Sequence, residues 1–346
     1  QEPGLNCPHC GTFAGKRLAD VFARHAQPSL RAAQRKKKDF ALKSKPVQMY
    51  LLIHPEWMKG TSGFVGDEEL GGWAGAPADA TSDWYEKRME HLQVIEVRGK
   101  KLPEVVTLAD GTEVETTRGT VPRRAHFTCA ACGREGNTLE SVRPTKHTAP
   151  VAAYTLQCHC PQCEAEGYTY GGRYFKAPDE YDLKRLAETE KDWASRMEGD
   201  LAEYWPRQIC WDAYMMRANG GVNDGWGYTH WWKMFNPRQL LVHTQLLQAI
   251  TEAPEEAWPL DVREQALGAF QQYLRNQNMF CFWDISRDCM APHMSNANYH
   301  PKSLVIENCV FNPIGRGNWQ SSNANAVSGL EWANNPWECL LLPDTE

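Results

Sequence analysis

The chain has 346 residues, of which 42% are hydrophobic and 23% charged, and this is enough for about two globular domains. The formal net charge of −6 excludes an overall polycation, so contact with nucleic acid requires a local basic patch. No apolar run approaches the ~18 residues of a membrane span, and no charged-then-apolar leader opens the sequence. We therefore expect a soluble, cytoplasmic protein with no membrane contact. Because the chain opens on Gln1 and stops abruptly after "LLLPDTE", we expect a fragment of a longer polypeptide.

The most informative pattern is a cysteine pair with two residues between its members. The 12 cysteines include three such pairs: Cys7/Cys10 in "CPHCG", Cys129/Cys132 in "CAACG" and Cys160/Cys163 in "CPQC". Two thiolates at this spacing reach one ion from a single tight turn, and two such turns complete a tetrahedral zinc site. Disulfide scaffolds are typically short and secreted, and a redox pair needs a βαβ context, so the pattern favours zinc.

The second and third pairs form the predicted site, because the strand-like runs "RRAHFT", "VAAYTLQ" and "YTYGGRYF" around them outline a zinc ribbon. The predicted zinc ligands are Cys129, Cys132, Cys160 and Cys163, with Cys7 and Cys10 in a related site or as replacement partners. Cys158 and His159 are spare candidates, and bystander positions are the plainer interpretation. Four thiolates close the coordination, so this zinc is expected to be structural. The alternatives are free core thiols and redox chemistry.

The first segment in chain order is basic. Ten Lys or Arg residues against two Asp lie between Lys16 and Lys45. We predict that four of them contact phosphates of double-stranded DNA, because each neutralised phosphate releases counterions: Arg35, Lys36, Lys37 and Lys38. The alternative is a solvated helix or loop. A buried strand over 47–53 follows, ended by His54-Pro55.

The middle of the chain is predicted to be rich in β-structure. A polar loop covers 61–83, a short helix and a strand follow within 83–99, and Asp110-Gly111 marks the turn of a hairpin. We expect three regions. Residues 1–60 carry the first cysteine pair, the basic segment and a strand, residues 61–178 form a β-rich zinc-ribbon insert, and residues 179–346 form a mixed helical and loop segment.

The last region is predicted to be largely helical. Dense charges over 179–205 predict one or two exposed helices, and a second amphipathic pattern covers 262–276. Between them, Asn236 is a suitable N-cap and Pro237 fits the first helical position. The tail from Asn308 is rich in Asn, Gly and Ser, and we predict loops that cover or approach a site.

A Gly- and aromatic-rich stretch precedes the helix that begins at Asn236. Trp231 and Trp232 could stack on DNA bases, and Arg238 and Gln239 in the first helical turn could face the DNA. The alternatives are core packing for the tryptophans and ordinary helix-start packing for the other two. No phosphate-binding loop, nucleophile elbow, H-E-x-x-H motif or dinucleotide glycine fingerprint is found, so no catalytic or cofactor-binding residue is assigned.

Several stretches in their order along the chain resemble one family. They are "CPHCG", "VQMYLLIHPEWMKG", "GTVPRRAHFTCAACG", "HTAPVAAYTLQCHCPQC", "YGGRYFKAPDE", "WGYTHWWKMFNPRQLLVHTQLL" and "GRGNWQSS". Through them the chain resembles the zinc-ribbon-containing adenine-specific DNA methylases, most closely the anti-phage-associated type. The similarity covers nearly the whole chain, and the block that ends in "NPRQLL" is its most specific part.

The resemblance implies an α/β chain, a mixed α+β segment, in which a zinc-ribbon hairpin insert interrupts a Rossmann-like methyltransferase fold. It implies methyl transfer from S-adenosylmethionine to the exocyclic amine of adenine in double-stranded DNA, with other phage-defence proteins as partners. The family's cofactor-binding glycine motif and Asp-Pro-Pro-Tyr motif are both missing from this sequence, so we expect the chain alone to be inactive and the cofactor site to lie outside it. The alternatives are a non-catalytic zinc-ribbon nucleic-acid-binding module and a structural interaction protein.

Overall fold

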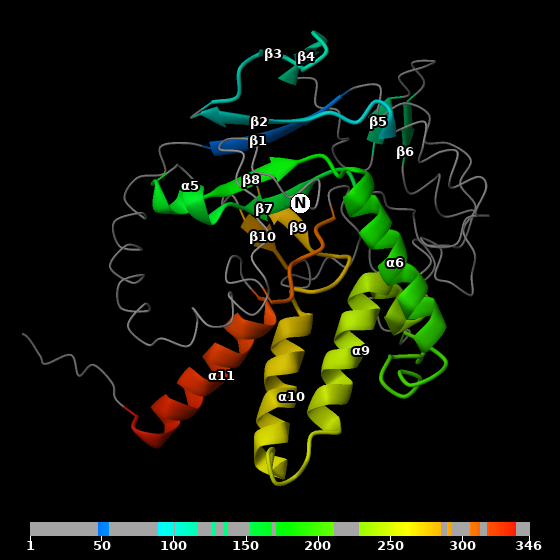
Figure 1. Ribbon diagram of the computed structural model, residues 1–346, viewed down its shortest axis with the longest axis vertical. Coiled ribbons are helices and arrows are strands. Elements are labelled where there is room, and N and C mark those ends of the chain that lie inside the picture. The colour runs from blue at the N-terminus through cyan, green and yellow to red at the C-terminus, as the bar shows by residue number, and fades with distance from the viewer. Residues whose placement is uncertain are drawn as a thin grey trace, which may run out of the picture. The chain divides into compact units, whose positions relative to one another are not determined.

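The computed structural model describes residues 48–54, 89–99, 101–116, 126–128, 135–137, 153–167, 171–210, 228–284, 289–292, 305–311 and 317–336. Cys7, Cys10, Cys129, Cys132 and the basic run 35–38 lie outside these ranges. The described chain has mixed α/β content (Figure 1). It divides into two compact units. Unit 1 comprises Gln1–Phe64, Ala76–Thr138 and Pro150–Ala187, and unit 2 comprises Val65–Gly75, Leu139–Ala149 and Glu188–Glu346.

The described part of unit 1 contains antiparallel two-stranded sheets. The pairs are β1 (Gln48–Ile53) with β2 (Val94–Gly99), β3 (Val105–Thr107) with β4 (Glu113–Glu115), β5 (His126–Thr128) with β6 (Glu135–Asn137), and β7 (Leu156–His159) with β8 (Arg173–Lys176). A short helix, α5 (Pro161–Ala165), follows β7, and helix α6 (Glu180–Arg196) runs from unit 1 into unit 2. The predicted strand over 47–53 is confirmed by β1.

The hairpin of β3 and β4 turns at Asp110 and Gly111, as the sequence predicts. Gly111 has a φ of 88°, which only glycine adopts easily. The amide of Thr112 donates to Oδ1 of Asp110 at 2.9 Å, and Oδ2 of Asp110 lies 2.8 Å from Nε2 of His54, at the end of β1. This turn is therefore hydrogen-bonded to the end of β1.

The strands β2 and β8 are connected through side chains of β2. The carboxylate of Glu96 accepts a hydrogen bond from the amide of Phe175, and Arg98 donates to the carbonyl of Arg173 at 3.3 Å. Arg98 and Glu96 also pair with each other at 2.9 Å. The backbone of β8 is thus paired with β7 on one side and with side chains of β2 on the other.

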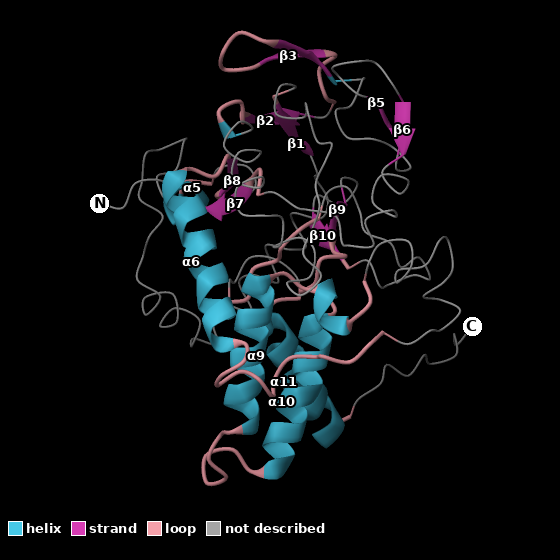
Figure 2. Ribbon diagram, turned by 90° about the vertical axis from the view of Figure 1, so that its right-hand side faces the viewer, coloured by secondary structure: helices cyan, strands magenta, loops and turns pink. Residues whose placement is uncertain are grey.

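Unit 2 is mainly helical in its described part. Its elements are η5 (Trp231–Met234), α9 (Pro237–Thr251), α10 (Leu260–Leu274), β9 (Phe282–Asp284), β10 (Cys289–Ala291) and α11 (Trp319–Asn334). Helix α10 contacts both α9 and α11 (Figure 2). Asn236 caps α9 and Pro237 opens it, and α6 and α10 lie where helices are predicted.

Among the described residues of unit 2, two clusters of buried side chains form a core. One contains Trp193, Leu201, Leu240 and Leu241. The other contains Ile250, Ala266, Phe270 and Tyr273. The first cluster joins α6 to α9, and the second joins α9 to α10, so each helix contributes an apolar stripe to a shared interior.

The prediction of loops from Asn308 onward is wrong over residues 319–334, which form α11. The side chain of Asn318 accepts a hydrogen bond from the amide of Ser321 at 2.8 Å and so caps the helix. The ring of Trp319 then packs edge-on against Tyr273, with centroids 6.1 Å apart. Capping and packing therefore outweigh the low helix propensity of the Asn, Ser and Gly residues.

All described strand pairings are antiparallel. A Rossmann-like parallel sheet therefore stays a prediction for this chain. Within the described ranges, none of the helices combines the length and apolar character that crossing a membrane demands.

Candidate metal site

The third cysteine pair lies on a tight turn between β7 and α5. Cys160 is the N-cap of α5, Pro161 occupies the first helical position, and Cys163 lies within the helix. Both cysteines are buried, with 0% and 2% of their surface exposed. The amide of Cys163 donates a hydrogen bond to Sγ of Cys160 at 3.4 Å. This turn brings two thiols to one place and directs an N–H group at one sulfur.

The backbone around Cys160 is fixed on both sides. Its amide donates to the carbonyl of Gly172 at 2.8 Å, and its carbonyl accepts from the amide of Glu164 at 3.1 Å. Tyr174, which is fully buried, packs with the two cysteines in one cluster. The hairpin of β7 and β8 therefore holds the turn before any metal binds.

The two spare candidates lie on opposite faces of β7. Cys158 packs against the buried cluster of Cys160, Cys163 and Tyr174, and burial raises the pKa of its thiol above the usual value. Nε2 of His159 lies 3.3 Å from a carboxylate oxygen of Glu164. Within the described ranges, no three or more His, Cys, Asp or Glu side chains are grouped so that they could hold a metal. A metal at the Cys160–Cys163 turn would therefore need further ligands from residues outside those ranges.

The second cysteine pair is flanked by a hairpin. Thr128 of β5 pairs with Glu135 of β6, so residues 129–134, which include Cys129 and Cys132, connect two paired strands. The side chains of this connection lie outside the described residues. Its place in the topology matches that of Cys160 and Cys163, which also follow directly on a paired strand.

The donor set fits zinc. Zinc is bound in structural sites by four ligands, and thiolates from two-residue-spaced pairs are its commonest set. Cys160 and Cys163 supply two sulfurs on a preformed turn, sheltered from water. Such a site would cross-link two hairpins and leave no open position for catalysis.

The predicted DNA contacts Trp231 and Trp232 lie in η5. Trp232 joins the cluster around Trp193, and its ring meets Trp205 edge-on with centroids 5.8 Å apart. Trp231 is half-buried, and its amide donates to the carbonyl of Gln208 at 3.1 Å. The position of Trp232 agrees with core packing, the alternative to base stacking.

Arg238 and Gln239 are both engaged within unit 2. Gln239 is 3% exposed and forms a capping box: its amide donates to Oδ1 of Asn236 at 2.8 Å, and its Oε1 accepts from the amide of Asn236 at 3.0 Å. Arg238 forms ion pairs with Glu190 and, at 2.7 Å, with Glu307. Burial raises the pKa of Glu190, an effect that Arg238 opposes. These contacts give both residues a role at the start of α9.

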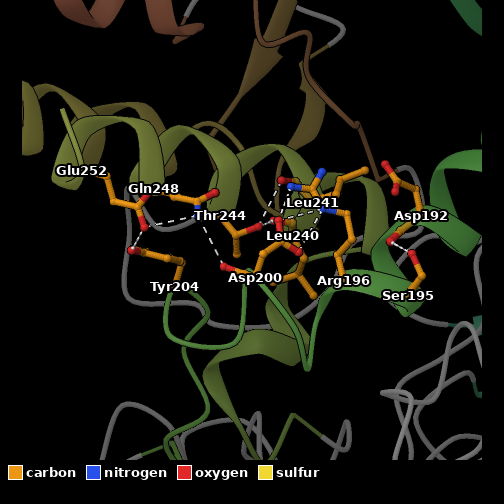
Figure 3. A network of polar contacts seen from close by, with 10 residues as sticks. All are labelled: Asp192, Ser195, Arg196, Asp200, Tyr204, Leu240, Leu241, Thr244, Gln248 and Glu252. Atoms are coloured by element: carbon orange, nitrogen blue, oxygen red, sulfur yellow. Dashed lines mark hydrogen bonds and ion pairs between the residues drawn. The ribbon is translucent and has the colours of Figure 1, made fainter. Parts of the chain in front are cut away.

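The structure also shows a buried polar group that no sequence motif indicates. Nε2 of His243 donates to the carbonyl of Gln277, and the hydroxyl of Tyr273 donates to Nδ1 of His243, both at 2.9 Å. Burial lowers the pKa of His243 to about 4, so the imidazole is neutral at pH 7. On the surface nearby, Tyr204, Gln248 and Glu252 connect the chain after α6 to α9 (Figure 3).

Comparisons of the chain with family models, with curated proteins and with solved structures found no match. What the chain does therefore has to be inferred from its own residues.

Proposed function

We propose that this chain is the zinc-ribbon-bearing, DNA-facing segment of an S-adenosylmethionine-dependent DNA methyltransferase that acts on N6 of adenine, in phage defence and in the cytoplasm. The observation that carries the proposal is the buried Cys160–Cys163 turn with its N–H···S hydrogen bond. It stands among the sequence stretches that resemble the zinc-ribbon adenine methylases.

The zinc in this proposal is structural. Cys160 and Cys163 supply one half of its ligands, Cys129 and Cys132 supply the other half, and Cys7 and Cys10 belong to a related site. The donor chemistry of all three pairs is the same, and the described pair lies on a preformed turn. The bound ion would cross-link the hairpin of β7 and β8 to the hairpin of β5 and β6.

The proposed DNA contact involves fewer residues than the sequence predicts. Arg35, Lys36, Lys37 and Lys38 remain candidate phosphate ligands, because four adjacent cations provide a local basic patch on an acidic chain. Gln239 is left out because it is buried, and Arg238 is left out because two carboxylates hold its guanidinium. Trp232 is left out because it packs in the core of unit 2.

The methyl transfer itself takes place on residues outside this chain. An enzyme that modifies a base in duplex DNA rotates that base into a pocket, and the pocket's motif must hold the adenine amine in line with the methyl group. This sequence has neither the glycine motif for S-adenosylmethionine nor the Asp-Pro-Pro-Tyr motif. The chain's part is to organise the zinc ribbon and to present the basic segment to DNA.

The test is to express the open reading frame that contains this chain, incubate the product with S-adenosylmethionine and unmethylated duplex DNA, and measure N6-methyladenine by mass spectrometry. We expect methylation that is lost in Cys160→Ser and kept in Cys309→Ser, a half-buried cysteine of unit 2. A zinc-loaded product that binds DNA without methylating it would contradict the proposal and favour the non-catalytic zinc-ribbon module.

A further inference from the structure

We propose that Gly172 is a positioning residue of the metal site, because the absence of a side chain lets β8 close against the turn that carries Cys160 and Cys163. This inference rests on the proposed zinc site. It adds a residue that has no ligand atom and that the spacing of the cysteines does not reveal.

The approach of the two backbones at this point is close. The carbonyl of Gly172 accepts a hydrogen bond from the amide of Cys160 at 2.8 Å. A Cβ atom at position 172 would lie 2.2 Å from the carbonyl oxygen of Cys160 and 3.0 Å from the amide nitrogen of Glu164. Both neighbours are backbone atoms, so they cannot rotate away as a flexible side chain would. Gly172 also has a φ of 77°, in the left-handed region.

The size of the clash decides its effect on metal binding. Ordinary contact begins at 3.4 Å, so a side chain at 172 requires a shift of roughly 1 Å between β8 and the Cys160 peptide. Metal–ligand distances in well-formed sites agree with their standard values to within about 0.2 Å, so a shift of this size would misplace a ligand. The peptide group that must move belongs to Cys160, whose Sγ is one of the proposed ligands. The amide of Cys163 donates a hydrogen bond to the same sulfur. The displacement is therefore expected to reach both ligands.

A matched control lies next to it. Gly171 has a φ of 59°, also in the left-handed region, but a Cβ atom at position 171 would meet nothing within 4 Å. Gly171→Ala therefore brings the same kind of backbone strain as Gly172→Ala without the close contact. The difference between the two variants isolates the approach of β8 to the Cys160 turn.

The experiment is a cobalt titration of the metal-free protein, followed by displacement with zinc, on the wild type, Gly172→Ala and Gly171→Ala. Tetrahedral cobalt bound by thiolates absorbs visible light. The titration curve therefore gives the metal affinity, and the absorption bands report the ligand geometry. We expect Gly172→Ala to lose about 10- to 100-fold in metal affinity, the range typical of residues that orient ligands, with altered absorption bands. Gly171→Ala is expected to stay within about threefold of the wild type.

Thermal unfolding of the metal-free variants separates positioning from general stability. If Gly172 acts only on stability, both glycine variants unfold at lower temperature and keep the wild-type metal affinity and spectrum, which overturns the inference. If Gly172→Ala is unfolded without metal, the zinc concentration needed to fold it gives the same comparison. A wild-type protein that binds neither metal would overturn the proposed zinc site itself, whereas equal binding by wild type and Gly172→Ala overturns only the role of Gly172.

Discussion

The two units of this chain are stabilised by different means. In unit 1 the described buried cluster consists of Cys160, Cys163 and Tyr174, and it lies among hairpins whose strands are three to six residues long. In unit 2, α9 and α10, of 15 residues each, bury leucine, phenylalanine and tyrosine side chains, and Trp193 of α6 packs against α9. Isolated hairpins are only marginally stable in water. Small β units therefore need a cross-link, such as a bound metal or a disulfide, that a packed helical unit does not need. This difference supports the proposal that a metal in unit 1 would take the part that apolar packing has in the described part of unit 2.

The interior of unit 2 is expected to be sensitive to pH. His243, Tyr273 and Gln277 form a hydrogen-bonded group among the apolar clusters, and His243 is 5% exposed. In a buried group of this kind, protonation of the imidazole would break its hydrogen bond with the Tyr273 hydroxyl and place a charge in the interior. Unit 1 is therefore expected to respond to metal and unit 2 to pH.

The largest expected effect follows from metal removal. Structural zinc contributes on the order of 10 kcal/mol of folding free energy to small domains. A chelator should therefore destabilise the hairpin of β7 and β8 far more than α9 and α10. Hydrogen exchange measured by mass spectrometry checks this, with zinc-saturated chelator as the control. Equal loss of protection in both units, or in neither, would contradict the division between them.

The second effect is acid destabilisation through His243. Its pKa is about 4 in the folded protein, against an ordinary value of 6.5, so the unfolded chain binds more protons between these values. Above pH 6.5, neutral His243 should make its full contribution to the free energy of unfolding. As the pH drops toward 4, this free energy should fall by up to roughly 3 kcal/mol. Denaturant unfolding of unit 2 at pH 7.5, 5.5 and 4.5 measures the slope, and His243→Gln should flatten it. The same slope in His243→Gln would assign the effect to other groups.

A smaller effect is expected at the start of α9. Asn236 caps the helix, and its side-chain amide donates to Glu307 at 2.5 Å. Removing such a cap costs about 1–2 kcal/mol, so Asn236→Ala should lower the free energy of unfolding of unit 2 by this amount. Asn325→Ala, on the exposed side of α11, is the matched control and should have little effect. Equal unfolding midpoints for the two variants would show that the capping box does not stabilise α9.

The smallest effect concerns the surface pair of Arg196 and Asp200, whose guanidinium and carboxylate lie 2.5 Å apart (Figure 3). The pair lowers the pKa of Asp200, but both groups are exposed to solvent and salt. Exposed pairs contribute little, so Asp200→Asn should leave the unfolding midpoint within experimental error. A clear shift of the midpoint would mean that this surface pair stabilises the end of α6.

Local chemistry accounts for the elements that sequence predicts well. Asn236-Pro237 supplies a cap and a fixed φ at the same helix start, and Asp110-Gly111 supplies a bonded turn with a glycine at positive φ. The cysteine turn is predictable for the same reason, because its spacing alone brings two sulfurs together. Each of these signals lies within a few adjacent residues.

What sequence does not predict depends on contacts between distant segments. Helix α11 forms because Trp319 packs against Tyr273, 46 positions earlier, and its own composition suggests loops. Arg238 forms ion pairs with Glu190 and Glu307, which are both far away in sequence. Gly172 resembles any turn glycine until β8 is placed against Cys160.

The central claim is that Cys160 and Cys163 hold a structural zinc, and the metal content of purified protein tests it most directly. Elemental analysis of the wild type, Cys160→Ser and Cys309→Ser gives zinc per chain, with circular dichroism to confirm folding. We predict about one zinc fewer per chain in Cys160→Ser than in the wild type, and no change in Cys309→Ser. A folded wild-type protein without zinc, or an unchanged zinc content in Cys160→Ser, would contradict the account.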